Sequence, residues 1–151
     1  MLHVMAHGAA GRLQPDHRTR LAEHFSRRFR VDVLTEYCRM YDVWPDVDVL
    51  MLDACDTFTE DWIRDLSYVI PQRRSVLFLG TTESVTWPRA TAYTNAFYTA
   101  LLHLELAGGG EDFASAARQA HQSATRAFRI LCDDEPPFRI RTIHGRGRPS
   151  S

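Results

Sequence analysis

The sequence predicts one α/β domain with a mostly parallel sheet. Two observations predict this class. Strand patterns alternate with helical patterns along the chain, and the two strongest strand patterns, at 47–53 and 75–80, are largely unbroken apolar runs. Such runs are typical of parallel strands that helices cover on both faces. The chain has 151 residues, of which 44% are hydrophobic and 25% charged. These values fit a single globular domain and exclude a disordered chain.

The first third of the chain has weaker patterns. Residues 2–6 form a short apolar run that ends in His7-Gly8, which predicts a strand. Apolar residues at positions i, i+3, i+4 and i+7 from Leu34 predict a helix. The full expectation here is a strand over 2–6, a loop over 9–27 with a short helix over 18–26, a strand over 29–33 and a helix over 34–41.

The centre of the chain has the clearest boundaries. Val49 to Leu52 is continuously apolar, as in a central strand. Thr59 then has the side chain of a helix N-cap, and Glu60 and Asp61 follow in the first turn, where the helix dipole favours acids. We therefore expect a helix over 60–69 that stops before Pro71.

The last half predicts one more strand, two long helices and a final strand. The glycines at 108–110 are a strong stop signal between the helices. The apolar stripes at 97–106 and 113–128 have helical spacing, which indicates core residues. The elements are a strand over 75–80, helices over 89–106 and 111–130, an edge strand over 138–143 and a flexible tail over 144–151.

Composition excludes several classes of function. The net charge is −1, so general nucleic-acid binding is not expected. No run approaches the roughly 18 apolar residues of a membrane span. Cys38, Cys55 and Cys132 have no CxxC spacing, and the histidines share no ligand spacing. We expect no disulfide framework, no metal and no cofactor, and a reducing, cytoplasmic location.

Two chemically active side chains follow expected strands. His7 comes after the first strand, and Cys55 comes after the strand that ends at Asp53. Polar groups collect at the carboxyl ends of parallel strands, so these two side chains share a crevice if their strands are neighbours. A histidine close to a thiol stabilises the thiolate, which is the nucleophile. His7 precedes Cys55 by 48 residues, close to the spacing of about 50 in caspases.

Gly8 fits the same chemistry. A glycine after the base lets a substrate carbonyl approach the backbone closely. Its N–H, together with the N–H of Cys55, can form an oxyanion hole. These residues favour a His7–Cys55 dyad when they are taken together. The alternative for each residue alone is a hydrogen-bonded histidine at a strand end and a small core cysteine.

The chain resembles a family along most of its length. Residues 2–8 are similar to the His-Gly strand of caspase-like (clan CD) cysteine peptidases, and in particular to the bacterial CHAT domains. The resemblance implies a caspase-like three-layer sandwich, with His7 as general base and Cys55 as nucleophile. It continues in order through 34–36, 49–57, 75–80, 95–102 and 113–120.

The chain departs from that family in two places. CHAT domains usually have a Trp and an Asp after the strand that corresponds to 75–80, and here Glu83 and Trp87 occupy those places. The caspase-like core also has two strands before its His strand, whereas this chain begins almost at that strand. We therefore expect an N-terminally reduced fold over 1–143 with an open sheet edge. Three explanations stay open: a partner chain or a homodimer covers that edge, the chain is a fragment of a larger protease, or the fold is simply reduced.

The resemblance also gives Asp53 a role in substrate specificity. Caspase-like enzymes that cut after Arg or Lys have an Asp two residues before the nucleophile, and Asp53 matches it. A carboxylate pairs with guanidinium through two hydrogen bonds, and Glu83 is a candidate second acid. The resemblance thus implies cleavage of a protein or peptide after a basic residue. The plain alternative is that Asp53 caps a helix or a turn at the strand end.

Two other functions remain open. An inactive or incomplete caspase-like module could bind a partner protein as a regulatory subunit. A small α/β hydrolase or nucleotide-binding domain of unrelated type is the third option. The absence of a GxSxG motif and of a Gly-rich phosphate loop argues against it.

Overall fold

The structure is a computed structural model that describes residues 1–5, 7–9, 12–14, 29–30, 47–53, 56–106 and 112–146. Within the first thirty residues it describes the side chains of Met1 and His3 and the backbone of four short strands. The helices expected over 18–26 and 34–41, Cys55 and the glycines at 108–110 lie outside the described residues.

The larger of the two sheets has the strand order β1-β5-β6-β7. β1 pairs with β5 and β5 with β6 in parallel, whereas β6 and β7 are antiparallel. The prediction of a mostly parallel sheet is confirmed, and β7 lies at an edge as expected. The strands are β1 (Leu2–Met5), β5 (Val49–Asp53), β6 (Ser75–Thr81) and β7 (Phe138–His144).

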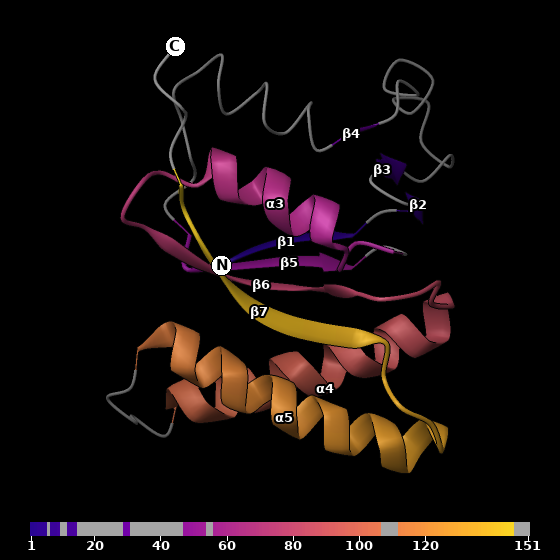
Figure 1. The fold of residues 1–151 in the computed structure, drawn as a ribbon. Helices are drawn as coiled ribbons and strands as arrows, with labels where there is room; N and C mark the ends of the chain where they lie inside the picture. The colour runs from indigo at the N-terminus through magenta and orange to yellow at the C-terminus, as the bar shows by residue number, and fades with distance from the viewer. Residues whose placement is uncertain are drawn as a thin grey trace, which may run out of the picture.

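Helices cover both faces of this sheet, which gives three layers (Figure 1). α3 (Glu60–Val69) lies on one face, and α4 (Trp87–Leu106) and α5 (Phe113–Cys132) lie on the other. Among the described residues, no helix combines the length and apolar character that crossing a membrane requires.

β5 shows why its sequence is apolar without a break. Val49 and Met51 belong to the core on the α4 and α5 side, while Leu50 and Leu52 belong to the core under α3. All five residues of the strand are buried, including Asp53. The interpretation of this run as a central strand is confirmed.

α3 begins where its cap predicts. The Thr59 hydroxyl accepts a hydrogen bond from the Trp62 amide at 3.3 Å, and Glu60 and Asp61 occupy the first turn. The apolar side of the helix packs Leu66 and its neighbours on the sheet. The helix ends at Val69, before Pro71, as expected.

The start of the chain differs from the prediction. The first strand stops at Met5, and His7–Ala9 form a separate strand, β2. β2 pairs antiparallel with β3 (Arg12–Gln14), which pairs with β4 (Phe29–Arg30) in a second sheet. The prediction of a loop across 12–14 was therefore wrong. A strand of three residues is too short to show an alternating pattern in the sequence. It is recognised only from its backbone pairing with neighbouring strands.

Smaller differences concern helix and strand ends. α4 starts two residues earlier than expected, at Trp87, and β7 continues to His144. Beyond β7, the Gly145 amide donates to the Arg74 carbonyl at 2.9 Å. The apolar stripe of α4 is buried at Phe97 but 86% exposed at Leu106, so its core part ends a turn before the helix does.

Candidate functional site

The strands that lead to His7 and Cys55 are neighbours. β1 and β5 pair from Leu2↔Leu50 to Met5↔Asp53, a constant offset of 48 residues. His7 and Cys55 are separated by the same number and each follows the last pair by two residues. The backbone of His7 and Gly8 lies in β2, opposite Gln14 and Leu13. Cys55 is outside the described residues, so the structure describes the approach of the two strands and not the dyad.

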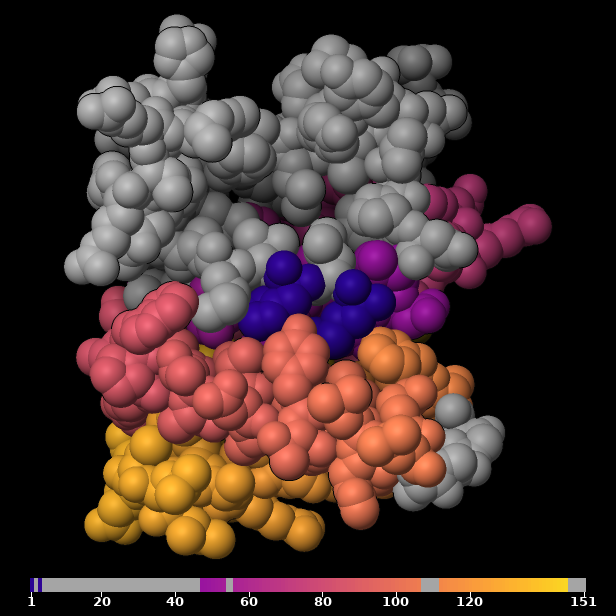
Figure 2. All heavy atoms as spheres, turned by 180° about the vertical axis from the view of Figure 1, so that it is seen from behind, coloured from indigo at the N-terminus to yellow at the C-terminus, as the bar shows by residue number. Residues whose placement is uncertain are grey.

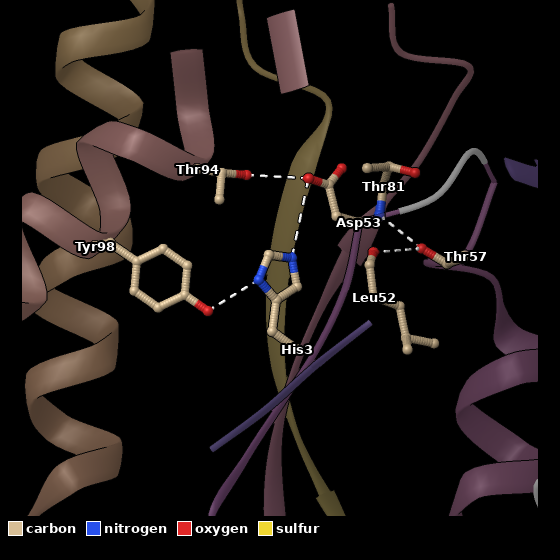
Figure 3. A network of polar contacts seen from close by, with 7 residues as sticks. All are labelled: His3, Leu52, Asp53, Thr57, Thr81, Thr94 and Tyr98. Atoms are coloured by element: carbon tan, nitrogen blue, oxygen red, sulfur yellow. Dashed lines mark hydrogen bonds and ion pairs between the residues drawn. The ribbon is translucent and has the colours of Figure 1, made fainter. Parts of the chain in front are cut away.

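Asp53 ends β5 as a buried carboxylate on the α4 side of the sheet. The residue is 5% exposed and its side chain 2%. The Thr94 hydroxyl, from α4, donates a hydrogen bond to Asp53 Oδ2 at 3.0 Å (Figure 3). A buried charge with a fixed donor is an arrangement that proteins maintain at structural or functional positions.

His3 completes this arrangement from β1. Its Nε2 lies 4.0 Å from Asp53 Oδ2, and its Nδ1 lies 2.9 Å from the Tyr98 hydroxyl of α4 (Figure 3). His3 Nε2 is buried and has no hydrogen-bond partner among the described atoms. The face opposite that of Figure 1 shows the N-terminal segment directly against α4 (Figure 2).

Burial shifts the pKa of both groups in the direction that favours their neutral forms. It lowers the pKa of His3, although the Asp53 carboxylate opposes the shift, so the imidazole is neutral at neutral pH. Because Nε2 faces the carboxylate, the tautomer with its proton on Nε2 is favoured electrostatically, and Tyr98 then donates to Nδ1. Burial likewise raises the pKa of Asp53, while the Thr94 hydrogen bond and His3 oppose that rise.

Thr57 anchors the chain two residues after Cys55. This side chain is buried; its hydroxyl donates to the Leu52 carbonyl at 3.2 Å and accepts from the Thr81 amide at 3.0 Å (Figure 3). Directly before it, Asp56 has a left-handed backbone with φ of 55°. These contacts attach the segment after β5 to the end of β6.

Gly80 makes this close approach feasible. A Cβ at this position would lie 2.8 Å from Thr57 Oγ1 and 3.3 Å from the Phe58 amide nitrogen. A side chain there would displace the segment that crosses β6. The single glycine of the β6 strand therefore serves packing.

Glu83 differs from Asp53 in its surroundings. It follows β6 by two residues, on the segment that leads to α4, and its side chain is exposed. Trp87, at the start of α4, is 67% exposed. The two predicted acids thus lie at the carboxyl ends of neighbouring strands: Asp53 is the buried last residue of β5, and Glu83 follows β6 and is exposed.

Sequence reasoning missed the partners of Asp53. Thr94 is a polar residue between Tyr93 and Phe97 on the buried side of α4. A lone polar residue in such a stripe is the signal that could have pointed to a buried polar contact. The histidine at position 3, inside an apolar strand pattern, is a similar signal. Among the described residues, no group of three or more His, Cys, Asp or Glu side chains could hold a metal ion.

A cavity of about 300 Å³ lies at the opposite edge of the sheet, away from Asp53. Asp48 and Ser75 line it from the amino ends of β5 and β6, and Asp112 and Arg118 line it from the start of α5. These four side chains are exposed, so this is an open surface hollow that gives no support to the predicted chemistry.

Comparison of the chain with known proteins found neither a matching family model nor a matching curated protein.

Proposed function

We propose that the chain is a caspase-like cysteine endopeptidase in which Cys55 is the nucleophile and His7 the general base. The observation that carries the proposal is the register of β1 and β5. Their offset of 48 residues equals the separation of His7 and Cys55. Adjacent parallel strands deliver the residues after their carboxyl ends to one crevice, and both residues follow the last pair by the same two steps.

The chemistry assigned to this pair is acyl transfer. His7 takes the thiol proton and the sulfur of Cys55 attacks the peptide carbonyl. The Gly8 and Cys55 amides stabilise the oxyanion. Collapse of the tetrahedral intermediate breaks the C–N bond, and His7 gives its proton to the leaving amine. Water then hydrolyses the thioester and regenerates the thiol. No cofactor takes part in this sequence of steps.

A preference for Arg or Lys before the cleaved bond is the second part of the proposal. Asp53 ends β5 and Glu83 follows β6 by two residues, and a carboxylate at this edge of the sheet favours a basic side chain. Glu83 is exposed and within reach of solvent, whereas the Asp53 side chain is 2% exposed. We therefore assign direct contact with the substrate to Glu83.

Peptide cleavage tests both parts. Fluorogenic peptides with Arg, Lys or Asp before the leaving group are incubated with wild type, Cys55→Ala and His7→Ala. Cys132→Ala, at the partly buried cysteine that ends α5, is the matched control. We expect wild type and Cys132→Ala to cut the Arg and Lys peptides, and Cys55→Ala and His7→Ala to cut none.

A thiol probe gives an independent measure. Iodoacetamide should modify Cys55 faster than Cys38 or Cys132, because a neighbouring histidine increases the thiolate fraction. The endopeptidase proposal is overturned if no peptide is cut and Cys55 reacts no faster than the other two thiols.

One observation favours the second candidate, a partner-binding module. In the part of the chain that the structure describes, β1 has a strand neighbour on one side only, β5. The other edge of β1 can accept a strand from a partner protein or from a second copy. Light scattering after size exclusion should then show a dimer or a stable complex. A monomer that cleaves peptides would contradict this candidate.

A further inference from the structure

We propose that Asp53 and Thr94 are positioning residues for the nucleophile segment, and that Asp53 does not form the wall of a pocket for a basic side chain. This inference rests on the proposed function, because it assigns the two residues a role in the reactivity of Cys55.

The Asp53 carboxylate is not accessible to a substrate side chain. A guanidinium pairs with a carboxylate through both oxygens, so both must be within reach. The Asp53 side chain is 2% exposed, and its Oδ2 already accepts the Thr94 hydroxyl at 3.0 Å. His3 Nε2 lies 4.0 Å from the same oxygen. A substrate side chain would have to displace α4 or β1 to make the pair.

Asp53 and His3 lie on the two strands that lead to the proposed nucleophile and base. Asp53 is two residues before Cys55 on β5, and His3 is four residues before His7 on β1. Thr94 and Tyr98 hold these two side chains from one face of α4 (Figure 3). One buried polar network therefore joins the strand that leads to the base, the strand that leads to the nucleophile and a single helix.

The chain after Cys55 has a second fixed contact, at Thr57. Thr57 fastens the chain two residues after Cys55 to Leu52 and to the end of β6. Asp53 and Thr57 are thus fixed contacts on either side of Cys55 in the chain, one with α4 and the other with Leu52 and the end of β6. If the Asp53 anchor loosens, the segment keeps one fixed end and gains freedom at the other. Misplacement by about 1 Å can cost about a hundredfold in rate.

The test uses a variant that removes the donor and keeps the shape. Thr94→Val deletes the hydroxyl from the hydrogen bond to Asp53, and Thr94→Ser retains it. Thr99→Val, at an exposed threonine of the same helix, is the matched control. We expect Thr94→Val to lower kcat by tenfold or more for Arg and Lys peptides alike, since positioning affects every substrate equally. KM should change by less than about twofold, and Thr94→Ser should recover most of kcat.

Alkylation of Cys55 by iodoacetamide supplies a readout without a substrate pocket. Its rate at neutral pH should fall in Thr94→Val, return in Thr94→Ser and stay unchanged in Thr99→Val. If Thr94→Val fails to fold, Tyr98→Phe takes its place, because it removes only the hydroxyl that contacts His3. This variant should lower kcat in the same direction.

The outcomes separate the two proposals. A wild-type protein without peptidase activity and without rapid Cys55 alkylation overturns the proposed function, and this inference with it. An active wild type whose Thr94→Val variant keeps full kcat and full alkylation overturns the inference alone. A pocket role for Asp53 is established instead if Asp53→Asn raises KM for the Arg peptide and spares kcat.

Discussion

Gly80→Ala should destabilise the fold, because its new methyl group clashes with the segment that follows Cys55. The new Cβ would lie 2.8 Å from Thr57 Oγ1, 3.0 Å from Phe78 Cζ and 3.3 Å from the Phe58 nitrogen. Contacts this short force atoms to move. The Thr57 hydroxyl is the closest, and if it moves it loses the hydrogen bonds to the Leu52 carbonyl and the Thr81 amide.

The magnitude follows from these contacts. Overpacking of a core costs about 1–3 kcal/mol, and each lost hydrogen bond about 1 kcal/mol. Alanine recovers about 0.5–1 kcal/mol, because it restricts the unfolded chain more than glycine does. We expect the free energy of unfolding to fall by about 2–4 kcal/mol. Urea titration followed by circular dichroism measures it.

A double-mutant cycle identifies the cause. Thr57→Ala removes the oxygen that the new Cβ meets, so Gly80→Ala should cost about 1–2 kcal/mol less in that background than in wild type. Thr57→Ser keeps the oxygen, so in that background the full cost should remain. Additive effects of Gly80→Ala and Thr57→Ala, or a loss below about 0.5 kcal/mol for Gly80→Ala alone, would show that the contact with Thr57 Oγ1 is not the cause.

Three further predictions concern stability. Gly145→Ala places a Cβ 2.1 Å from the Pro71 carbonyl oxygen, a backbone atom that cannot rotate away, so thermal unfolding should show a loss of at least about 2 kcal/mol. Asp112→Ala removes the α5 cap on the Ser115 amide and should cost about 1 kcal/mol by urea titration, whereas Asp112→Asn should cost little. Burial lowers the pKa of His121 to about 4, so the folded state favours the neutral ring. The free energy of unfolding is therefore unaffected by protonation of this residue above about pH 6.5. It falls as the pH drops from about 6.5 towards 4, because the unfolded chain then binds a proton that the folded chain does not. Urea titrations at pH 7.5 and pH 4.5 measure how far the free energy of unfolding drops on acidification. This drop should be about 1–2 kcal/mol smaller for His121→Gln than for wild type, after allowance for solvent screening. Equal drops in the two proteins would contradict the prediction.

The sequence predicted those parts of the fold that local chemistry determines. Thr59 and Pro71 bound α3, and the unbroken apolar run of β5 indicated two covered faces, because these signals depend on near neighbours in the chain. β3 was missed because three residues carry no periodicity and the strand depends on its pairing with β2 and β4.

The sequence could predict which site residues lie at strand ends, but not which side chains contact them. The pattern indicated that Asp53 ends a buried strand. The pairing of β1 with β5 was only a condition of the predicted site, and the structure shows that pairing. The network around Asp53 was not foreseen, because Thr94 and His3 reach it from positions 41 and 50 residues away in the chain. Pairings of this kind depend on how α4 lies on the sheet, and no local pattern determines that.

The place of β1 in the sheet also concerns the order of folding. Within the described chain, β5, β6, β7 and the three helices all come from residues 49–144, whereas β1 joins this unit only after a 48-residue separation is closed. Loop closure of that length has an entropic cost that local contacts do not have. We therefore expect β1 to dock late and to open at lower free energy than the rest of the sheet, which hydrogen exchange would detect as weaker protection of its amides. Under the proposed function, His7 follows this strand, so peptidase activity would appear only after β1 has docked.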